Sequence, residues 1–98
     1  MIYNIELKEE VRAELKKLSK QQQVLITKQF IKISKSPELG HLLGNKNGYN
    51  LSGCRKMYVD NKKIRIVYRI IDDKIVVEVV AIGKREDMQV YKNASQRL

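Results

Sequence analysis

Residues 54–83 read CRKMYVDNKKIRIVYRIIDDKIVVEVVAIG, and this stretch decides the fold. Apolar and polar side chains follow a period of two through most of it, which is the period of a β-strand. Two short polar breaks divide the stretch into three strands, and strands joined by such short turns form an antiparallel meander. We place the strands at Cys54–Val59, Lys63–Ile71 and Lys74–Gly83, with turns at Asp60-Asn61-Lys62 and Asp72-Asp73.

The residues before the meander predict one strand and two helices. Met1–Leu7 alternates apolar and polar side chains and is typical of a short strand. Lys8–Leu18 changes to helical spacing, with acidic residues in the first turn and lysines in the last. A second helix begins at Ser19, whose spacing to Gln22 resembles a capping box, and it ends before Pro37. Almost no residues separate the two helices, so we expect an antiparallel helical hairpin.

The remaining segments complete an α+β fold in one domain of residues 1–98. Glu38–Asn50 is rich in glycine and asparagine and is expected to be a loop. Arg85–Leu98 has apolar residues at helical spacing and is expected to form a short terminal helix. The predicted order is therefore β-α-α-β-β-β-α. We expect the first strand to join the meander at an edge and the helical hairpin to cover one face of the sheet.

The charge of the chain points to a negatively charged partner. Twenty Lys and Arg against eleven Asp and Glu give a net charge of +9. Residues 46–74 hold eight basic and three acidic side chains, a net of +5, so the excess is concentrated there. Nucleic acid, an acidic protein or an anionic membrane would fit such a surface, and a generally solubilising basic surface is the plainer alternative.

Several classes of protein are disfavoured by composition. Cys54 is the single cysteine, so no internal disulfide or cysteine-based zinc site is expected, and we interpret it as a small core residue. One histidine, His41, and no carboxylate cluster with metal-ligand spacing give no reason to expect a metal or a cofactor. No apolar run approaches membrane-spanning length and no signal-peptide core is seen, so we expect a cytoplasmic protein without membrane contacts.

Strand alternation gathers basic and aromatic residues on one face of the meander. Lys56 and Tyr58 share an open face with Arg65, the third strand ends by delivering Arg85, and Tyr91 can fold back beside it. The further candidates for substrate contact, besides Tyr58, are Arg55, Lys84 and Arg69.

This set of side chains fits RNA chemistry. Guanidinium groups bind phosphate oxygens in a bidentate manner, and tyrosines stack on bases or donate hydrogen bonds. The set would also suit cleavage in which a 2′-hydroxyl attacks the adjacent phosphate. Such cleavage needs a base, cations on the phosphate and an acid for the leaving oxygen, but no metal, because the substrate carries the nucleophile. Arginines on an exposed strand face are often only solvated, so the residues alone favour RNA binding over catalysis.

Four segments in order resemble the RelE/ParE superfamily of bacterial toxins, and its RelE-like branch most closely. They are LSGCRK at 51–56, KIRIVY at 63–68, VVAIGKRE at 79–86 and the pair Val90-Tyr91. The resemblance implies the toxin of a type II toxin–antitoxin pair. RelE-like members are endoribonucleases that cut messenger RNA in the ribosomal A site and arrest translation. The implied partners are the ribosome, messenger RNA and an acidic antitoxin that forms a hetero-oligomer with the toxin.

The resemblance also implies roles for individual residues. Arg65 matches an arginine that steadies the scissile phosphate, and Arg85 matches one assigned to the phosphate or to the leaving group. Tyr91 matches a tyrosine that positions or stacks the substrate base, and Lys56 matches one lysine of a pair. Tyr58 stands where the family has the second lysine, a candidate general base. Lys56 or Tyr58 would have to serve instead, with a pKa lowered by neighbouring cations.

Two other functions remain open on the same fold. A ParE-like inhibitor of DNA gyrase would be a binding module, although the retained basic set argues against it. A non-catalytic RNA- or antitoxin-binding protein is the other alternative, and the departure at Tyr58 is its motive.

Overall fold

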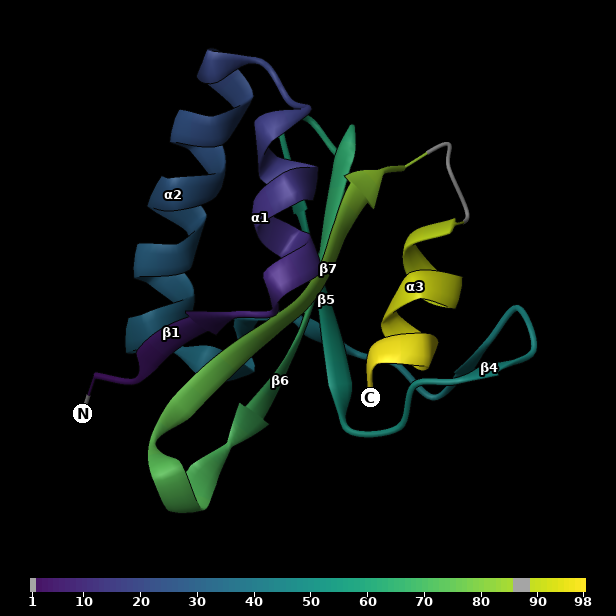
Figure 1. The fold of residues 1–98 in the computed structure, drawn as a ribbon. Helices are drawn as coiled ribbons and strands as arrows, with labels where there is room; N and C mark the ends of the chain where they lie inside the picture. Colours follow the sequence, from purple (N-terminus) through teal and green to yellow (C-terminus); the bar gives the residue numbers. More distant parts are fainter. Residues whose placement is uncertain (1, 86–88) are drawn as a thin grey trace.

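A five-stranded sheet with helices on both faces forms the protein in a computed structural model that describes residues 2–85 and 89–98 (Figure 1). The strand order across the sheet is β1-β7-β6-β5-β2. The elements are β1 Asn4–Leu7, α1 Glu9–Lys16, α2 Lys20–Lys35, η1 Pro37–Leu39, β2 His41–Leu42, β3 Asn45–Lys46, β4 Tyr49–Asn50, β5 Cys54–Val59, β6 Ile64–Ile71, η2 Asp72–Lys74, β7 Val76–Lys84 and α3 Gln89–Arg97. Within the described ranges no helix is long and apolar enough to cross a bilayer.

The antiparallel meander and the edge position of the first strand are confirmed. β5, β6 and β7 pair in sequence, and β1 lies beside β7 at the sheet edge, parallel to it, with Asn4 opposite Val76. The expected loop at residues 38–50 is wrong in part, because β2 pairs with β5 and β3 pairs with β4. These strands have two residues each, which is too short to show a period. The β3–β4 turn is Asn47-Gly48, both with positive φ (53° and 82°), as such hairpins favour.

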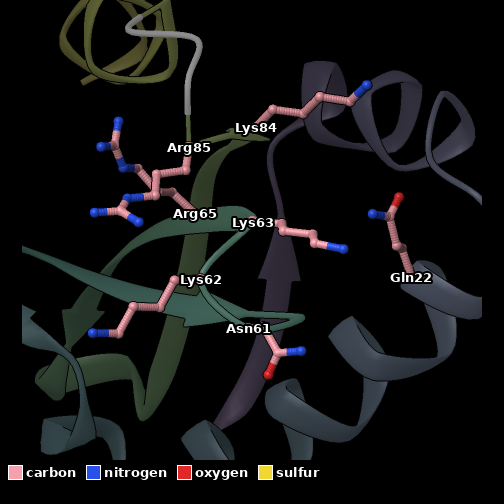
Figure 2. Close-up of a pocket in the computed structure, with 7 residues that line it drawn as sticks. All are labelled: Gln22, Asn61, Lys62, Lys63, Arg65, Lys84 and Arg85. Atoms are coloured by element: carbon pink, nitrogen blue, oxygen red, sulfur yellow. The ribbon is translucent and has the colours of Figure 1, made fainter.

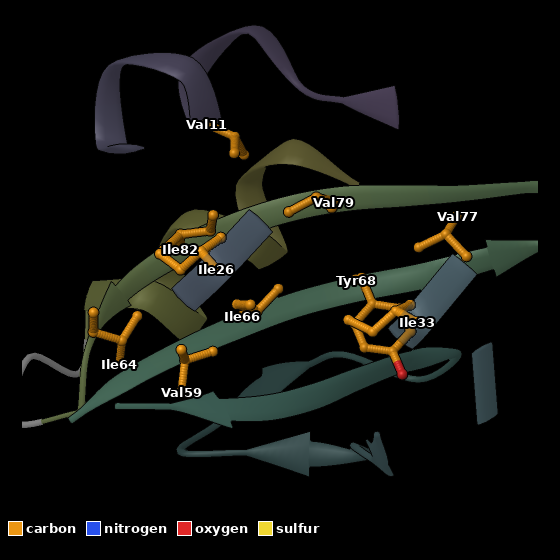
Figure 3. Close-up of a cluster of buried hydrophobic side chains, with 10 residues drawn as sticks. All are labelled: Val11, Ile26, Ile33, Val59, Ile64, Ile66, Tyr68, Val77, Val79 and Ile82. Atoms are coloured by element: carbon orange, nitrogen blue, oxygen red, sulfur yellow. The ribbon is translucent and has the colours of Figure 1, made fainter. Parts of the chain in front are cut away.

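The helical hairpin packs on one face of the sheet, as expected. The Ser19 side chain accepts a hydrogen bond from the Gln22 backbone, and the Gln22 side chain caps Ser19 in return, so the predicted capping box is present. The cluster under the helices is Val11, Ile26, Ile33, Val59, Ile64, Ile66, Tyr68, Val77, Val79 and Ile82 (Figure 3). This cluster fixes the first face of the sheet as a core face.

The other face of the sheet is not open, contrary to the prediction. The terminal helix α3 covers much of it, with the β3–β4 hairpin beside α3 (Figure 1). Cys54 is fully buried there, as its interpretation as a core residue requires, and burial raises the pKa of its thiol. The second cluster is Leu43, Leu51, Cys54, Val67, Val80, Ala81, Val90, Tyr91 and Ala94. Among the described residues, the basic and aromatic candidates Lys56, Tyr58 and Arg65 lie at the end of this face near the β5–β6 turn.

A β-bulge interrupts the pairing of β6 with β7. Val67 pairs with Ala81, but the next residue, Tyr68, pairs with Val79. Val80 is therefore an extra residue in β7, and it packs on the same side of the sheet as Ala81. From this point the alternation of β7 is shifted by one residue.

The bulge decides which face receives the last residues of β7. Val79 faces the helical hairpin, and beyond the bulge the residue on that side is Ile82. Gly83 consequently lies on the α3 side, opposite Arg65, where an added Cβ would come within 3.2 Å of the Val90 Cβ. Unbroken alternation would have turned Gly83 and Arg85 to the helical hairpin instead.

A largely buried ion pair contacts the bulge where β7 extends beyond the end of β1. Arg97 of α3 donates to Glu14 of α1 through both terminal nitrogens, at 2.9 and 3.1 Å. The same arginine donates to the Val80 carbonyl at 2.9 Å, and the Ile82 N–H donates to Glu14 at 3.1 Å. The two helix layers are thereby tied together around the residues that reorient β7.

Candidate functional site

Three cations surround the ring of Tyr58 at the end of the sheet where β5 and β7 end and β6 begins. Tyr58 lies directly opposite Arg65 in the β5–β6 ladder. The Lys56 Nζ is 5.0 Å from the centroid of the Tyr58 ring, and the guanidinium carbons of Arg65 and Arg85 are 6.0 and 5.8 Å from it. The structure therefore brings together Lys56, Tyr58, Arg65 and Arg85, as alternation and the resemblance led us to expect.

The surroundings of the Tyr58 hydroxyl favour its ionised form. The Lys56 Nζ donates a hydrogen bond to it at 3.2 Å. This hydrogen bond favours the ionised form of Tyr58 most, and a hydrogen bond from Arg65 and the positive charges of both residues add to it. Together these interactions outweigh desolvation and lower the pKa of Tyr58 to about 8. A tyrosine with this pKa is partly deprotonated near neutral pH, so its oxygen can accept a proton.

The ring of Tyr91 packs against the guanidinium group of Arg65. Its ring centroid is 4.9 Å from the Arg65 guanidinium carbon, and Lys46 of the β3–β4 hairpin places its Nζ 6.0 Å from the same ring. Tyr91 is 0% exposed and Arg65 is 8% exposed. The Tyr91 hydroxyl has no hydrogen-bond partner among the residues that the structure describes. In this conformation the ring is packed against an arginine and is not presented to a base.

Arg85 is exposed at the end of β7. Its backbone N–H donates to the Lys63 carbonyl at 2.7 Å, which anchors its main chain beside the β5–β6 turn. Glu86, the last residue of the motif, lies outside the described residues. Arg85 thus combines a fixed backbone with an exposed side chain that can meet a phosphate.

The other predicted substrate contacts lie elsewhere. Arg55 donates to the carbonyls of Glu38 and Gly40, at 3.1 and 2.8 Å, and so joins β5 to the segment before β2. Arg69 forms an ion pair with Glu78 at 2.7 Å, toward the opposite end of β6. Lys84 is exposed and extends toward the helical hairpin (Figure 2). None of these three arrangements places the side chain in the group around Tyr58.

Lys46 belongs to the site region although sequence reasoning did not single it out. It lies on β3, and the hairpin of β3 and β4 brings it over the Tyr91 ring. The Asn47-Gly48 dipeptide could have predicted the hairpin. Nothing local to the chain predicts that the hairpin reaches α3, because that contact depends on the folded sheet.

A basic pocket of about 610 Å³ borders the site at the β5–β6 turn (Figure 2). It is lined by Gln22, Asn61, Lys62, Lys63, Arg65, Lys84 and Arg85. Within the described part of the chain, no three His, Cys, Asp or Glu side chains gather as a metal site. The arrangement can hold phosphates and accept a proton at Tyr58.

Comparison with known proteins identifies the family. The sequence model for the ParE toxin of the type II toxin–antitoxin system parDE matches residues 5–89. The chain belongs to this toxin family. The mRNA interferase toxin RelE of Escherichia coli strain K12 is 31% identical over 100 residues, covering 100% of this chain and 99% of that protein. The predicted membership of the RelE/ParE superfamily, and of its RelE-like branch, is therefore confirmed.

Solved structures of RelE toxins share the fold of this ParE-family toxin. An arginine-to-alanine double mutant of E. coli RelE in the free state matches with a TM-score of 0.82 and 30% identity, covering 100% of this chain and 99% of that chain. The toxin of the intact E. coli RelBE toxin–antitoxin complex matches with a TM-score of 0.71 and 27% identity, covering 84% and 95%. The predicted RelE-like α+β fold is confirmed, and the gyrase-inhibitor alternative is not favoured.

Proposed function

We propose that this RelE-like toxin cleaves messenger RNA in the ribosomal A site, by attack of a 2′-hydroxyl on the adjacent phosphate, and so arrests translation. The observation that carries the proposal is the group of three cations around a tyrosine whose pKa is lowered to about 8. It combines a proton acceptor with phosphate-binding charges in one place. The E. coli relative bears the name mRNA interferase, which supports the same reaction class.

The proposed reaction uses residues for each proton and charge. Tyr58, as tyrosinate, takes the 2′-hydroxyl proton while the 2′ oxygen forms a bond to phosphorus. Arg65 and Arg85 stabilise the extra negative charge on the phosphate oxygens. The bond to the 5′ oxygen then breaks, Arg85 stabilises the negative charge on this oxygen, and the oxygen takes a proton from Arg85 or from water. Because the substrate carries the nucleophile, the reaction requires no metal ion.

Tyr91 is proposed to position Arg65 instead of stacking on a base. Tyr91→Leu is expected to lower the cleavage rate about tenfold by letting the Arg65 guanidinium shift, whereas Tyr91→Phe keeps the ring and should keep the rate. Rates would be measured in single turnovers on programmed ribosomes. In an Arg65→Ala background Tyr91→Leu should cost nothing further. An equal loss from Tyr91→Leu in both backgrounds would show that the ring acts on the RNA directly.

The proposed partner is an antitoxin that is acidic where it meets this chain. The related E. coli toxin was solved in the RelBE toxin–antitoxin complex, which supports a hetero-oligomer. A net charge of +9 favours an acidic surface on such a partner. Action on ribosomes places the proposed activity in the cytoplasm.

Mapping of RNA ends on ribosomes tests the proposed function. The purified toxin is added to ribosomes that carry a defined message in the A site, and primer extension locates new 5′ ends. We expect ends within the A-site codon, and none when the A site holds a bound tRNA. A folded toxin that yields no ends would be a non-catalytic binding protein, and an SOS response with intact message in cells would indicate gyrase inhibition.

A further inference from the structure

The basic pocket at the β5–β6 turn contains two groups of cations, and the proposed cleavage uses only one. Arg65, Arg85 and Lys62 extend to one side of the strands, whereas Lys63 and Lys84 extend the other way, toward the helical hairpin that contains Gln22 (Figure 2). We call Lys63, Lys84 and the Gln22 side chain the lysine corner. Because all of these residues line one pocket, the pocket continues from the guanidiniums to the lysine corner.

Within the described part of the chain, the lysine corner has an excess of positive charge, with one adjoining acid, Asp60. Every charged residue among those that line the pocket is basic. Asp60 lies next to the pocket, and its Oδ2 accepts a hydrogen bond from the Gln22 Nε2 at 3.1 Å. The first turn of α2 contains no acidic residue. Such a concentration of one sign of charge in a concave surface favours an anion.

A second basic hollow adjoins the lysine corner. Lys84 also lines a pocket of about 390 Å³ together with Lys17 at the end of α1. The acid in that pocket, Glu14, is held in its ion pair with Arg97. The positive surface therefore extends from Lys63 past Lys84 to Lys17.

The backbone of the lysine corner is held in place before any ligand binds. Asp60, Asn61 and Lys62 all have left-handed backbone conformations, with φ of 55°, 53° and 67°. The hydrogen bond from Gln22 to Asp60 ties this turn to the capped start of α2. The Lys63 carbonyl accepts from the Arg85 N–H at 2.7 Å, so Lys63 lies beside Arg85 on the neighbouring strand. The backbone segments that carry the two groups of cations are thus held next to each other.

We propose that the lysine corner binds a second phosphate of the RNA strand that is cleaved, so that the strand bends around the β5–β6 turn. This inference rests on the proposed function, because it takes the phosphate held by Arg65 and Arg85 to be the scissile one. The Lys63 and Arg85 backbones are hydrogen-bonded and their side chains extend to opposite sides, so an RNA strand held at Arg85 can bring another phosphate to Lys63 by passing around the turn. The lysine corner would add affinity and fix the direction of the strand without taking part in the chemistry.

Binding of a short RNA with single neutral linkages tests the proposal. The probe is a single-stranded 2′-O-methyl RNA, which lacks the attacking hydroxyl, with one methylphosphonate linkage moved along the chain. For the unmodified protein, affinity should fall on the order of tenfold at two linkages. In Lys63→Gln/Lys84→Gln one of these two effects should vanish, and in Arg85→Ala the other should. In the lysine variant, the slope of log affinity against log salt concentration should also be smaller in magnitude by about 0.7 for each phosphate contact that is lost.

A matched variant and a second readout make the outcome decisive. Lys35→Gln/Lys74→Gln removes the same charge from exposed positions away from the pocket and should keep both sensitive linkages. Equal weakening at every linkage in the lysine-corner variant would overturn the proposal, and so would an effect seen only on ribosomes. If two linkages are sensitive but the protein does not cleave RNA on ribosomes, the proposed function would be contradicted while phosphate binding at the lysine corner would still be supported.

Discussion

Arg85→Ala is expected to slow messenger RNA cleavage about 10²–10³-fold without unfolding the protein. The loss follows from removing a guanidinium that would stabilise charge on the scissile phosphate. The side chain is exposed and its fixed contact is made by the backbone N–H to Lys63, so truncation leaves the packing intact. Single-turnover cleavage on programmed ribosomes measures the rate, and a thermal melt measures the stability.

Matched variants separate charge from geometry at this position. Arg85→Lys keeps a charge but not the planar pair of donors, so it should recover only part of the rate. Arg12→Ala, on the exposed side of α1, removes an arginine far from Tyr58 and should cleave at the normal rate. A full rate in Arg85→Ala would remove Arg85 from the mechanism. Arg65→Ala is a less clean test, because Arg65 is 8% exposed and packs on Tyr91.

Capping motifs and strand periodicity predicted the fold well, because both depend only on residues that are close in sequence. The capping box at Ser19 and the period of two in β5 and β6 depend on spacing alone, and both are present in the structure. Two-residue strands such as β2 carry no period, so the edge of the sheet was missed. The second core face was also missed, because the position of α3 depends on its fit against the sheet.

The site could be predicted only up to the bulge in β7. Alternation alone puts Lys56, Tyr58 and Arg65 on one face, as the structure does. Arg85 reaches that face because Val80 is an extra residue, and a run of valines gives no local sign of where a bulge will form. The sequence analysis placed Arg85 beside this face from the end of the third strand, and the resemblance named the same residue, but neither predicted the bulge that turns it there. Alternation therefore predicts which face of the sheet a residue occupies only up to the first β-bulge in its strand.

Tyr58→Phe is expected to lower the cleavage rate about 10²–10⁴-fold, because it removes the proposed general base and keeps the ring. The three cations around the ring remain, so RNA binding should change little. Tyr58→Lys, which restores the residue that the family has here, should recover activity. Cleavage by Tyr58→Phe at the normal rate would assign the proton transfer to another group.

The pH dependence of cleavage gives an independent measure of the same role. The tyrosinate is the reactive form, and the pKa of Tyr58 is lowered to about 8. The rate should therefore rise tenfold per pH unit below about 8 and level off above it. Lys56→Gln removes the hydrogen bond that lowers this pKa most, so the midpoint should move toward the ordinary tyrosine value near 10. A midpoint that stays in place in Lys56→Gln would show that the titrating group is not Tyr58, whereas an upward shift would tie the rate to this tyrosine and its lysine.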